Sequence, residues 1–299
     1  MKLMSESHPC CGLGRWIFLF PLLLAAAASA QSSAYPYNQY LDRNDEPYGE
    51  GYVGYTLQAD VDAPGVNSLG FVDFSAGGGF LYFDTAIGTF DIKGGIDGIV
   101  FVDGGGLKLP NQVGTAALGL LYTWRDYSGL SLQVDAWPGI YSDWRDIDGG
   151  DLFMPFGLTA LYAVSPEFAL LAGFEIYPEF QREIDPRLGL RWAPLENLVV
   201  DLAYPESRVT FSPSLEWDLY AGASMIKTLE WQLKRTDERD HLMIDENRVF
   251  AGLRKLLLND LKLVFEAGQV FDHELDFTEG PAISVEDALY FRTGVAAVY

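Results

Sequence analysis

Residues 290–299 read YFRTGVAAVY, and their alternating pattern decides the class of fold that we expect. Side chains of an extended strand point to its two faces in turn, so Phe291, Val295 and Tyr299 would share one face and Arg292 would lie on the other. We therefore expect the chain to finish in a β-strand with one apolar face.

The same strand resembles the insertion signal that ends bacterial outer-membrane β-barrels. In that signal a polar residue, a glycine two positions later and a terminal aromatic residue recur, and Arg292, Gly294 and Tyr299 hold these positions here. Ala297 fills the hydrophobic position with a small side chain. The resemblance implies that the barrel-assembly machinery binds this strand. The alternative is a soluble protein whose last strand happens to end the chain.

Residues 1–30 have the layout of a secretory signal peptide. Lys2 and Arg15 precede an apolar run that begins at Trp16 and closes on the small residues Ala28 and Ala30. The apolar part is too short to span a membrane, and small residues at these two positions are those that a signal peptidase reads. We expect cleavage after Ala30 and export of the remaining 269 residues.

The exported part would contain no cysteine, because Cys10 and Cys11 both leave with the signal peptide. Disulfides and thiol chemistry are therefore excluded. Beyond Ala30, no apolar stretch approaches the roughly 18 residues that a spanning helix needs. If the protein crosses a membrane, it must do so as a closed barrel, because lipid cannot satisfy the backbone of an open sheet edge.

The charge excludes one class of partner. Removing Lys2, Arg15 and Glu6 from the 20 basic and 42 acidic residues leaves 18 and 41, a net charge of −23. Such a chain would repel the phosphates of nucleic acid. Aromatic residues at 14% and 31 glycines suit a barrel with aromatic girdles and tight turns, although they also suit a large soluble β-sandwich.

Alternation dominates the rest of the chain. Residues 31–50 are irregular and rich in Tyr, Pro, Asn and acidic residues, and we expect one transmembrane barrel over residues 51–299. Within it, segments of about ten residues with one apolar and one polar face are typical of membrane-spanning strands. The clearest examples are residues 130–137, 198–204, 215–223 and 261–268.

Long and short connections alternate between these segments. Outer-membrane barrels show this asymmetry, with tight periplasmic turns and longer external loops. We expect an antiparallel barrel of about 12 to 16 strands, with 14 favoured, because the number is even when both chain ends are periplasmic. The predicted long connections are 104–113, 142–151, 178–185, 205–213, 235–245 and 272–286, and the short ones are 126–128, 164–166, 193–196, 224–226 and 257–260.

From Pro186 onward the chain resembles a family of uncharacterised Gram-negative outer-membrane β-barrels, known only as a domain of unknown function. The resemblance rests on residues 191–208 (RWAP followed by Leu202, Pro205 and Arg208), on 217–222 (WDLYAG) and on 266–275 (EAGQVF followed by Glu274 and Leu275). It implies a barrel fold. It implies no activity, cofactor or catalytic residue, because none is assigned to that family.

Catalytic and metal-binding patterns are weak. His241 and His273 are the only histidines after residue 30, and we expect both in the long acidic loops, away from any serine that a triad would need. No G-x-S-x-G elbow is present. The acidic run 143–151 suggests a calcium loop, but its spacing fails the EF-hand pattern. We predict no enzyme, no cofactor and no metal; an outer-membrane hydrolase is the weakest alternative.

Charged residues on the polar faces would line the lumen, because charges that face lipid near the midplane cost a few kcal/mol each. Their excess of acid would favour cations in an open pore. Alternatively, opposite charges would pair and plug the barrel. The predicted lining residues are Asp135, Glu175, Asp201, Glu216, Asp218, Glu266, Arg125, Arg248, Arg254, Lys262 and Arg292.

We therefore expect a protein of the cell outer membrane that contacts lipid and passes small solutes or ions, as a passive porin-like channel with weak cation preference. The main alternative is a closed barrel that acts as a structural or surface-interaction protein through its acidic loops. A soluble periplasmic β-protein is the competing fold.

Overall fold

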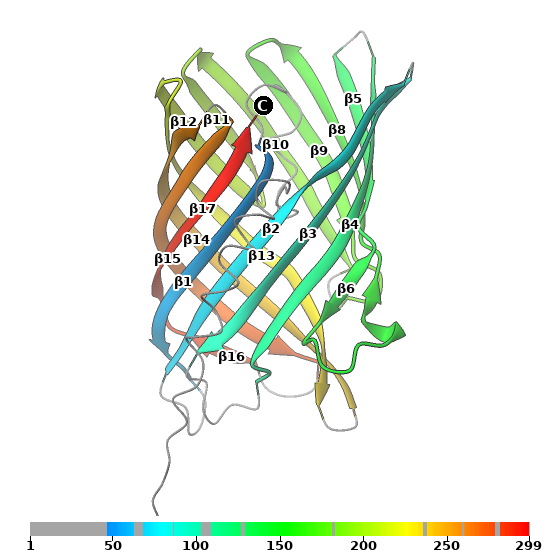
Figure 1. The fold of residues 1–299 in the computed structure, drawn as a ribbon, viewed down its shortest axis with the longest axis vertical. Helices are drawn as coiled ribbons and strands as arrows, with labels where there is room; N and C mark the ends of the chain where they lie inside the picture. The colour runs from blue at the N-terminus through cyan, green and yellow to red at the C-terminus, as the bar shows by residue number, and fades with distance from the viewer. Residues whose placement is uncertain are drawn as a thin grey trace, which may run out of the picture.

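The computed structural model of the chain is an all-β barrel (Figure 1). The predicted signal peptide with Ala28 and Ala30, residues 31–46 and the terminal Tyr299 lie outside the residues that the structure describes. The first strand begins at Pro47, before the predicted start of the barrel at residue 51. The described residues are 47–62, 68–85, 87–102, 109–126, 129–180, 183–235, 238–258, 260–278 and 282–298.

The sheet contains seventeen strand segments in chain order. They are β1 (Pro47–Asp60), β2 (Ser68–Thr85), β3 (Gly88–Val102), β4 (Gln112–Arg125), β5 (Leu130–Ala136), β6 (Gly139–Ser142), β7 (Leu152–Phe153), β8 (Phe156–Ser165), β9 (Phe168–Ile176), β10 (Ile184–Leu195), β11 (Leu198–Tyr204), β12 (Glu206–Ser214), β13 (Trp217–Arg235), β14 (Glu238–Leu258), β15 (Leu261–Phe277), β16 (Ile283–Val285) and β17 (Ala288–Val298).

Successive wall strands pair antiparallel, and β1 pairs with β17 to close the sheet. Three wall strands are each interrupted once and therefore consist of two segments. These two-segment strands are β5 with β6, β7 with β8, and β16 with β17, and the two segments of each lie along the same neighbouring wall strand. The wall therefore has 14 strands, as the sequence favoured. Closure leaves no sheet edge for lipid to satisfy.

The two ends of the barrel differ. Tight turns at 166–167, 196–197 and 215–216 lie at the end where β1 starts and β17 finishes, which we call the turn end (top of Figure 1). The opposite loop end carries longer connections, such as 143–151 and 177–183. This is the asymmetry that the spacing predicted, but two predicted stretches, 205–245 and 272–286, are largely strand; in the second, residues 272–277 belong to β15 and residues 283–285 form β16.

Within residues 205–245 the predicted connections were wrong. Residues 206–214 form strand β12, residues 224–226 lie inside β13, and residues 238–245 of the predicted connection 235–245 belong to β14. β12 looks like a loop because its only large apolar outward side chains are Val209 and Phe211, among polar residues. β13 and β14 look interrupted because they run far beyond the length that spans a bilayer.

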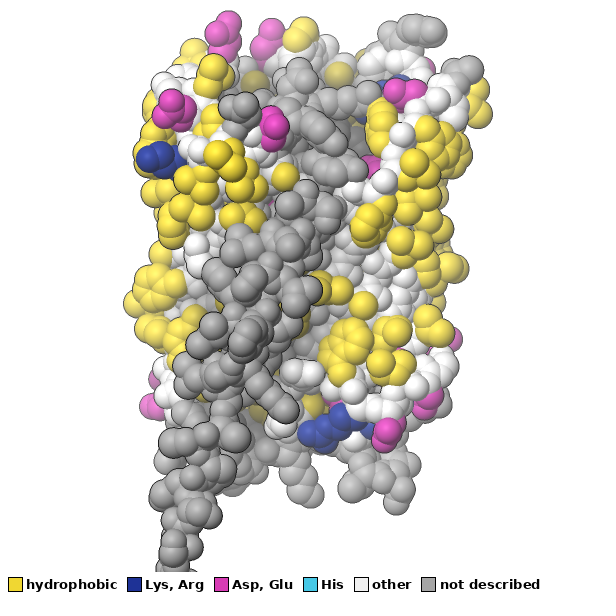
Figure 2. All heavy atoms as spheres, in the orientation of Figure 1, with side chains coloured by type: hydrophobic (Ala, Val, Ile, Leu, Met, Phe, Trp, Pro, Cys, Tyr) yellow, Lys and Arg dark blue, Asp and Glu magenta, His cyan; other side chains and the backbone are white. Residues whose placement is uncertain are grey.

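The outer surface is apolar between the two ends. Large hydrophobic side chains such as Leu120, Leu202, Val249, Phe265 and Phe291 are exposed on the outside of the wall. Figure 2 shows hydrophobic side chains over the visible wall and charged side chains near its two ends. A water-exposed surface of this kind would aggregate, whereas a bilayer requires it. None of the helices among the described residues is long and apolar enough to cross a membrane.

The largest hydrophobic cluster lies inside the loop end of the barrel. Trp231 and Leu233 of β13 and Leu242 and Ile244 of β14 are almost fully buried there. They pack with residues of other strands, namely Leu69, Phe71, Val113, Leu275, Phe277, Ile283 and Val285. We call residues 229–235 and 238–244, the outer parts of β13 and β14, the arm.

Candidate functional site: the charged lumen and its closure

The arm crosses the mouth of the barrel. In the wall order β13 and β4 lie on opposite sides, yet Trp231 Nε1 donates to Thr115 Oγ1 of β4 at 3.2 Å. Gln232 also forms a parallel bridge with Ser142 of β6, and its carbonyl accepts from the Asp143 backbone N–H at 3.1 Å. The arm thus spans the loop end and closes it over the lumen.

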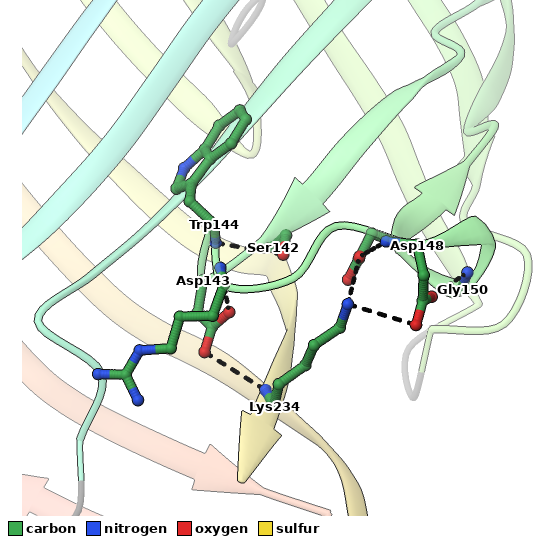
Figure 3. A network of polar contacts seen from close by, with 8 residues as sticks. Ser142, Asp143, Trp144, Asp148, Gly150 and Lys234 are labelled. Carbon is green, nitrogen blue, oxygen red and sulfur yellow. Dashed lines mark hydrogen bonds and ion pairs between the residues drawn. The ribbon is translucent and has the colours of Figure 1, made fainter.

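A salt-bridge cluster fastens the arm to the loop between β6 and β7 (Figure 3). The ammonium of Lys234 lies 3.3 Å from Asp148 Oδ2 and 3.2 Å from Asp151 Oδ2. The Lys234 backbone N–H donates to Asp143 Oδ2 at 3.3 Å. Asp151 is fully buried, and it also accepts from the Asp148 backbone N–H at 2.7 Å, which shapes the 3-10 turn η2 (Gly149–Asp151). We call these contacts of Lys234 the latch.

On the turn-end side of the arm, Arg292 of β17 is the centre of the lumen network. Its guanidinium lies 3.1 Å from Asp73 of β2 and 3.4 Å from Glu266 of β15. The Tyr290 hydroxyl donates to Glu266 at 3.0 Å, and the Tyr52 ring lies 4.0 Å from the guanidinium carbon. Because a buried charge is tolerated only when it is paired, this network explains how the charges stay inside the barrel.

Two more arginines lie on the same side of the lumen. Arg208 of β12 pairs with Glu206 at 2.7 Å, and Arg248 of β14 pairs with Glu246 at 2.5 Å. The Arg208 guanidinium packs against the Tyr220 ring at 4.8 Å. Nearer the turn end, Lys262 pairs with Asp218 at 2.8 Å and Arg191 with Asp201 at 3.6 Å.

The opposite side of the lumen is mainly acidic and aromatic. Asp135 of β5 is buried and accepts from Trp137 Nε1 at 3.1 Å. Glu175 of β9 pairs with Arg187 of β10 and accepts from the Tyr177 hydroxyl at 2.6 Å.

Most of the predicted lining residues point inward. Glu216 and Arg125 do not belong to the buried network: Glu216 is an exposed turn residue between β12 and β13, and Arg125 is exposed at the end of β4. The rule that every second residue of a strand faces the lumen fails at strand ends, where the wall stops. The inward-facing predicted residues are Asp135, Glu175, Asp201, Asp218, Glu266, Arg248, Arg254, Lys262 and Arg292.

Sequence reasoning missed several partners of these residues. Asp73 stands between Val72 and Phe74 in a regular alternation, so its inward position could have been found. Glu206 and Arg208 were hidden because β12 was taken for a loop.

A cavity of about 190 Å³ lies between the two sides of the lumen. Asp73, Glu175, Arg208 and Arg292 are among the residues that line it, and Trp231 of the arm lies over it. The described residues contain no cluster of three or more His, Cys, Asp or Glu that could hold a metal ion.

The histidine prediction was wrong. His241 and His273 are strand residues of β14 and β15, because these strands continue beyond the membrane-spanning length. His241 Nδ1 lies 2.5 Å from Glu230 of the arm, and His273 stacks on the Phe71 ring at 4.6 Å. In the part of the chain that the structure describes, no serine hydroxyl bonds to either imidazole.

No family model and no curated protein matches the chain by sequence. Among solved structures, a deltaS2 mutant of the TodX monoaromatic hydrocarbon channel is similar, with 9% identity, a TM-score of 0.50, and coverage of 91% of this chain and 96% of TodX. The fold is that of an outer-membrane β-barrel.

Two further matches are weaker. The KdgM porin in complex with disordered oligogalacturonate has 8% identity and a TM-score of 0.36 over 84% of this chain and 99% of the porin. An outer-membrane channel from Pseudomonas putida F1 has 14% identity and a TM-score of 0.43 over 86% and 99%.

Proposed function

We propose that this chain is an outer-membrane channel for small solutes, closed at its loop end by the arm. The observation that carries the proposal is the combination of an apolar outer wall with a charged, cavity-containing lumen. A barrel that served only as a scaffold would be filled more simply by apolar side chains, because buried ion pairs seldom stabilise a fold better than hydrophobic packing does.

The lining supports a weak preference for cations. Among the described residues, seven carboxylates and four guanidinium groups line the cavity. The carboxylates are those of Asp73, Asp97, Glu175, Asp185, Glu206, Glu230 and Glu266, and the guanidinium groups are those of Arg187, Arg208, Arg248 and Arg292. An excess of acid in a pore raises the local concentration of cations.

The location follows from the same features. With the turn end in the periplasm, the loop end and the arm would face the exterior, as in other outer-membrane barrels. Export would depend on the predicted signal peptide, and insertion on recognition of the last strand, with Gly294 and Tyr299, by the assembly machinery. No catalytic step is part of this proposal, because both imidazoles contact carboxylates and neither contacts a nucleophile among the described residues.

The arm favours one alternative function. If the latch never opens, the protein is a closed barrel whose external surface binds other molecules. The arm supports this reading because it fills the mouth with a hydrophobic cluster instead of leaving it hydrated.

Conductance separates the two functions. Residues 31–299 would be refolded, checked for the mobility difference between boiled and unboiled samples, and reconstituted into a planar bilayer across a KCl gradient. We expect brief, discrete openings with a cation-side reversal potential. Folded protein that inserts without any opening would refute the channel and leave the closed barrel; an anion-side reversal potential would refute the cation preference.

A further inference from the structure

Two neighbouring wall strands, β11 and β12, are short at the loop end. β11 and β12 have seven and nine residues, whereas β13 and β14 have 19 and 21. Only Pro205 separates β11 from β12, so this hairpin stops short of its neighbours. Its last contacts with β13 are the pairing of Glu206 with Ser224 and the bond from the Met225 N–H to the Pro205 carbonyl at 2.9 Å.

Beyond the tip of this hairpin, toward the loop end, β13 and β14 bend away from the wall. The β13–β14 register shifts between Ile226 and Leu229, and the β14–β15 register shifts between Asp245 and Asn247. Such irregularities bend strands, and here they mark the place where the arm leaves the wall to cross the mouth. On the other side, residues 184–187 of β10 pair with β9, and pairing with β11 starts only at Leu188.

These three edges bound a window in the wall, formed by residues 184–187, the tip at Pro205, and β13 from Met225 onward. The lumen cavity reaches it, because Pro205, Ser224 and Met225 line that cavity. The same three residues also line a groove of about 380 Å³ on the outer face of the wall. Met225 is half exposed on the outside although it borders the lumen. The lumen and the lipid-facing surface therefore meet at the window.

The window lies at membrane depth. β13 starts at the turn end, and Ser224 lies seven residues after its first residue. A rise of about 3.3 Å per residue at a tilt of about 40° places Ser224 about 18 Å from the turn end. The apolar band of such barrels is about 25 Å tall. The window therefore opens onto the half of the bilayer nearer the loop end.

The residues that line the groove indicate which kind of molecule passes through the window. The outer part of the groove is apolar, with Leu188, Leu202 and Phe271. Two residues beside the window each carry a buried polar atom without a hydrogen-bond partner: Asn247 Oδ1 and, on the lumen side, Arg248 Nε. The first is an acceptor and the second a donor, and a hydroxyl or an amide, which both donates and accepts, can bond to each in turn as it passes from the groove to the lumen.

We propose that the window is a lateral passage between the lumen and the bilayer, and that its solutes are neutral amphipathic molecules with an apolar body and one hydroxyl or amide group. An acid would be disfavoured, because the cavity behind the window carries an excess of carboxylates. This inference deepens the proposed channel function and names a route that avoids the closed mouth.

Cysteine labelling from the lipid tests the passage. The exported chain contains no cysteine, so Ser224→Cys at the window and Ser75→Cys on β2, away from the window, give single thiols. Both serines are almost fully buried and line the same cavity, which makes them a matched pair. In liposomes, each variant would react with N-(1-pyrenyl)maleimide, which dissolves in the bilayer, and separately with iodoacetamide, which reacts from water.

We expect the ratio of pyrenyl to iodoacetamide labelling rates to be on the order of tenfold higher for S224C than for S75C, because lipid concentrates the apolar reagent beside the window. Equal ratios would overturn the passage. Added 1-octanol should slow pyrenyl labelling of S224C, whereas sodium octanesulfonate should not; equal slowing by both would overturn the preference for neutral molecules.

A blocking variant tests whether the groove is the route by which the reagent reaches the thiol. In the S224C background, Ser207→Trp fills the groove, whereas Val209→Trp places the same ring two residues away on the same outer face of β12. Only the former should lower the ratio; no effect from either would count against the window. Labelling needs no current, so a chain that labels as expected but never conducts would refute the channel and leave the passage intact.

Discussion

The latch should control how often the channel opens, and Lys234→Ala tests this. The variant removes the ammonium that lies between Asp148 and the fully buried Asp151. Loss of one partner from a buried pair costs about 3–5 kcal/mol, and an exposed pair contributes about 0–1 kcal/mol. Here Asp148 is half exposed and Asp151 keeps its bond to a backbone N–H, so we expect a loss of closed-state stability between these two limits.

We expect the loss to change the ratio of the two states by a factor on the order of ten. Single-channel recording should therefore show the ratio of open to closed time rising by about that factor. Lys234→Arg keeps the charge and should restore most of the closure, and Lys255→Ala removes a lysine that contacts Trp217 instead of the latch and should change nothing. Raising the KCl concentration should weaken the latch in the native chain, because salt shortens the range of charge interactions. Folded Lys234→Ala with an unchanged open probability would refute the role of the latch.

Three further predictions concern the lumen. Arg292→Met should lower the free energy of unfolding by about 3–5 kcal/mol, because two carboxylates lose their partner, while Arg125→Met at the rim should change it little. The measurement is a urea titration in which the folded fraction is followed on gels by the mobility difference between boiled and unboiled samples. Equal effects of the two substitutions would show that the network is unimportant. Gly252→Ala should hinder refolding in the same gel assay, since a methyl group there overlaps the Tyr220 ring; normal folding yield and stability would contradict the tight packing. Glu175→Gln removes one of the lining carboxylates and should move the reversal potential toward zero in a KCl gradient, and an unchanged potential would show that this residue does not set selectivity.

Local alternation was enough to predict the fold class. Strand β17 with Arg292 inward and Phe291 outward is what its sequence indicates, because lipid and lumen impose opposite preferences on neighbouring residues. The rule worked wherever a strand presented several apolar residues to lipid. It failed in β12, whose polar composition resembles a loop, and in the parts of β13, β14 and β15 that were predicted as connections.

Contacts between distant segments were beyond such reasoning. Arg292 and Asp73 are 219 residues apart and meet only because β1 closes the barrel between their strands. The arm was equally hidden, since its apolar residues follow on from a membrane strand and nothing local indicates that they turn inward to Thr115 across the mouth. The candidate site was therefore predictable as a set of inward charges, but its pairs, its cavity and its closure were not.

Movement of the arm should open the lumen, and a reversible tether between the arm and β6 tests this. Ser142 and Gln232 are bridge partners at the contact between β6 and the arm, so a disulfide between cysteines at these two positions would hold the arm across the mouth. The S142C/Q232C chain would be recorded in a planar bilayer before and after addition of reductant. We expect no conductance in the oxidised form and discrete openings once the disulfide is reduced. The same conductance in both forms would show that the arm does not close the channel.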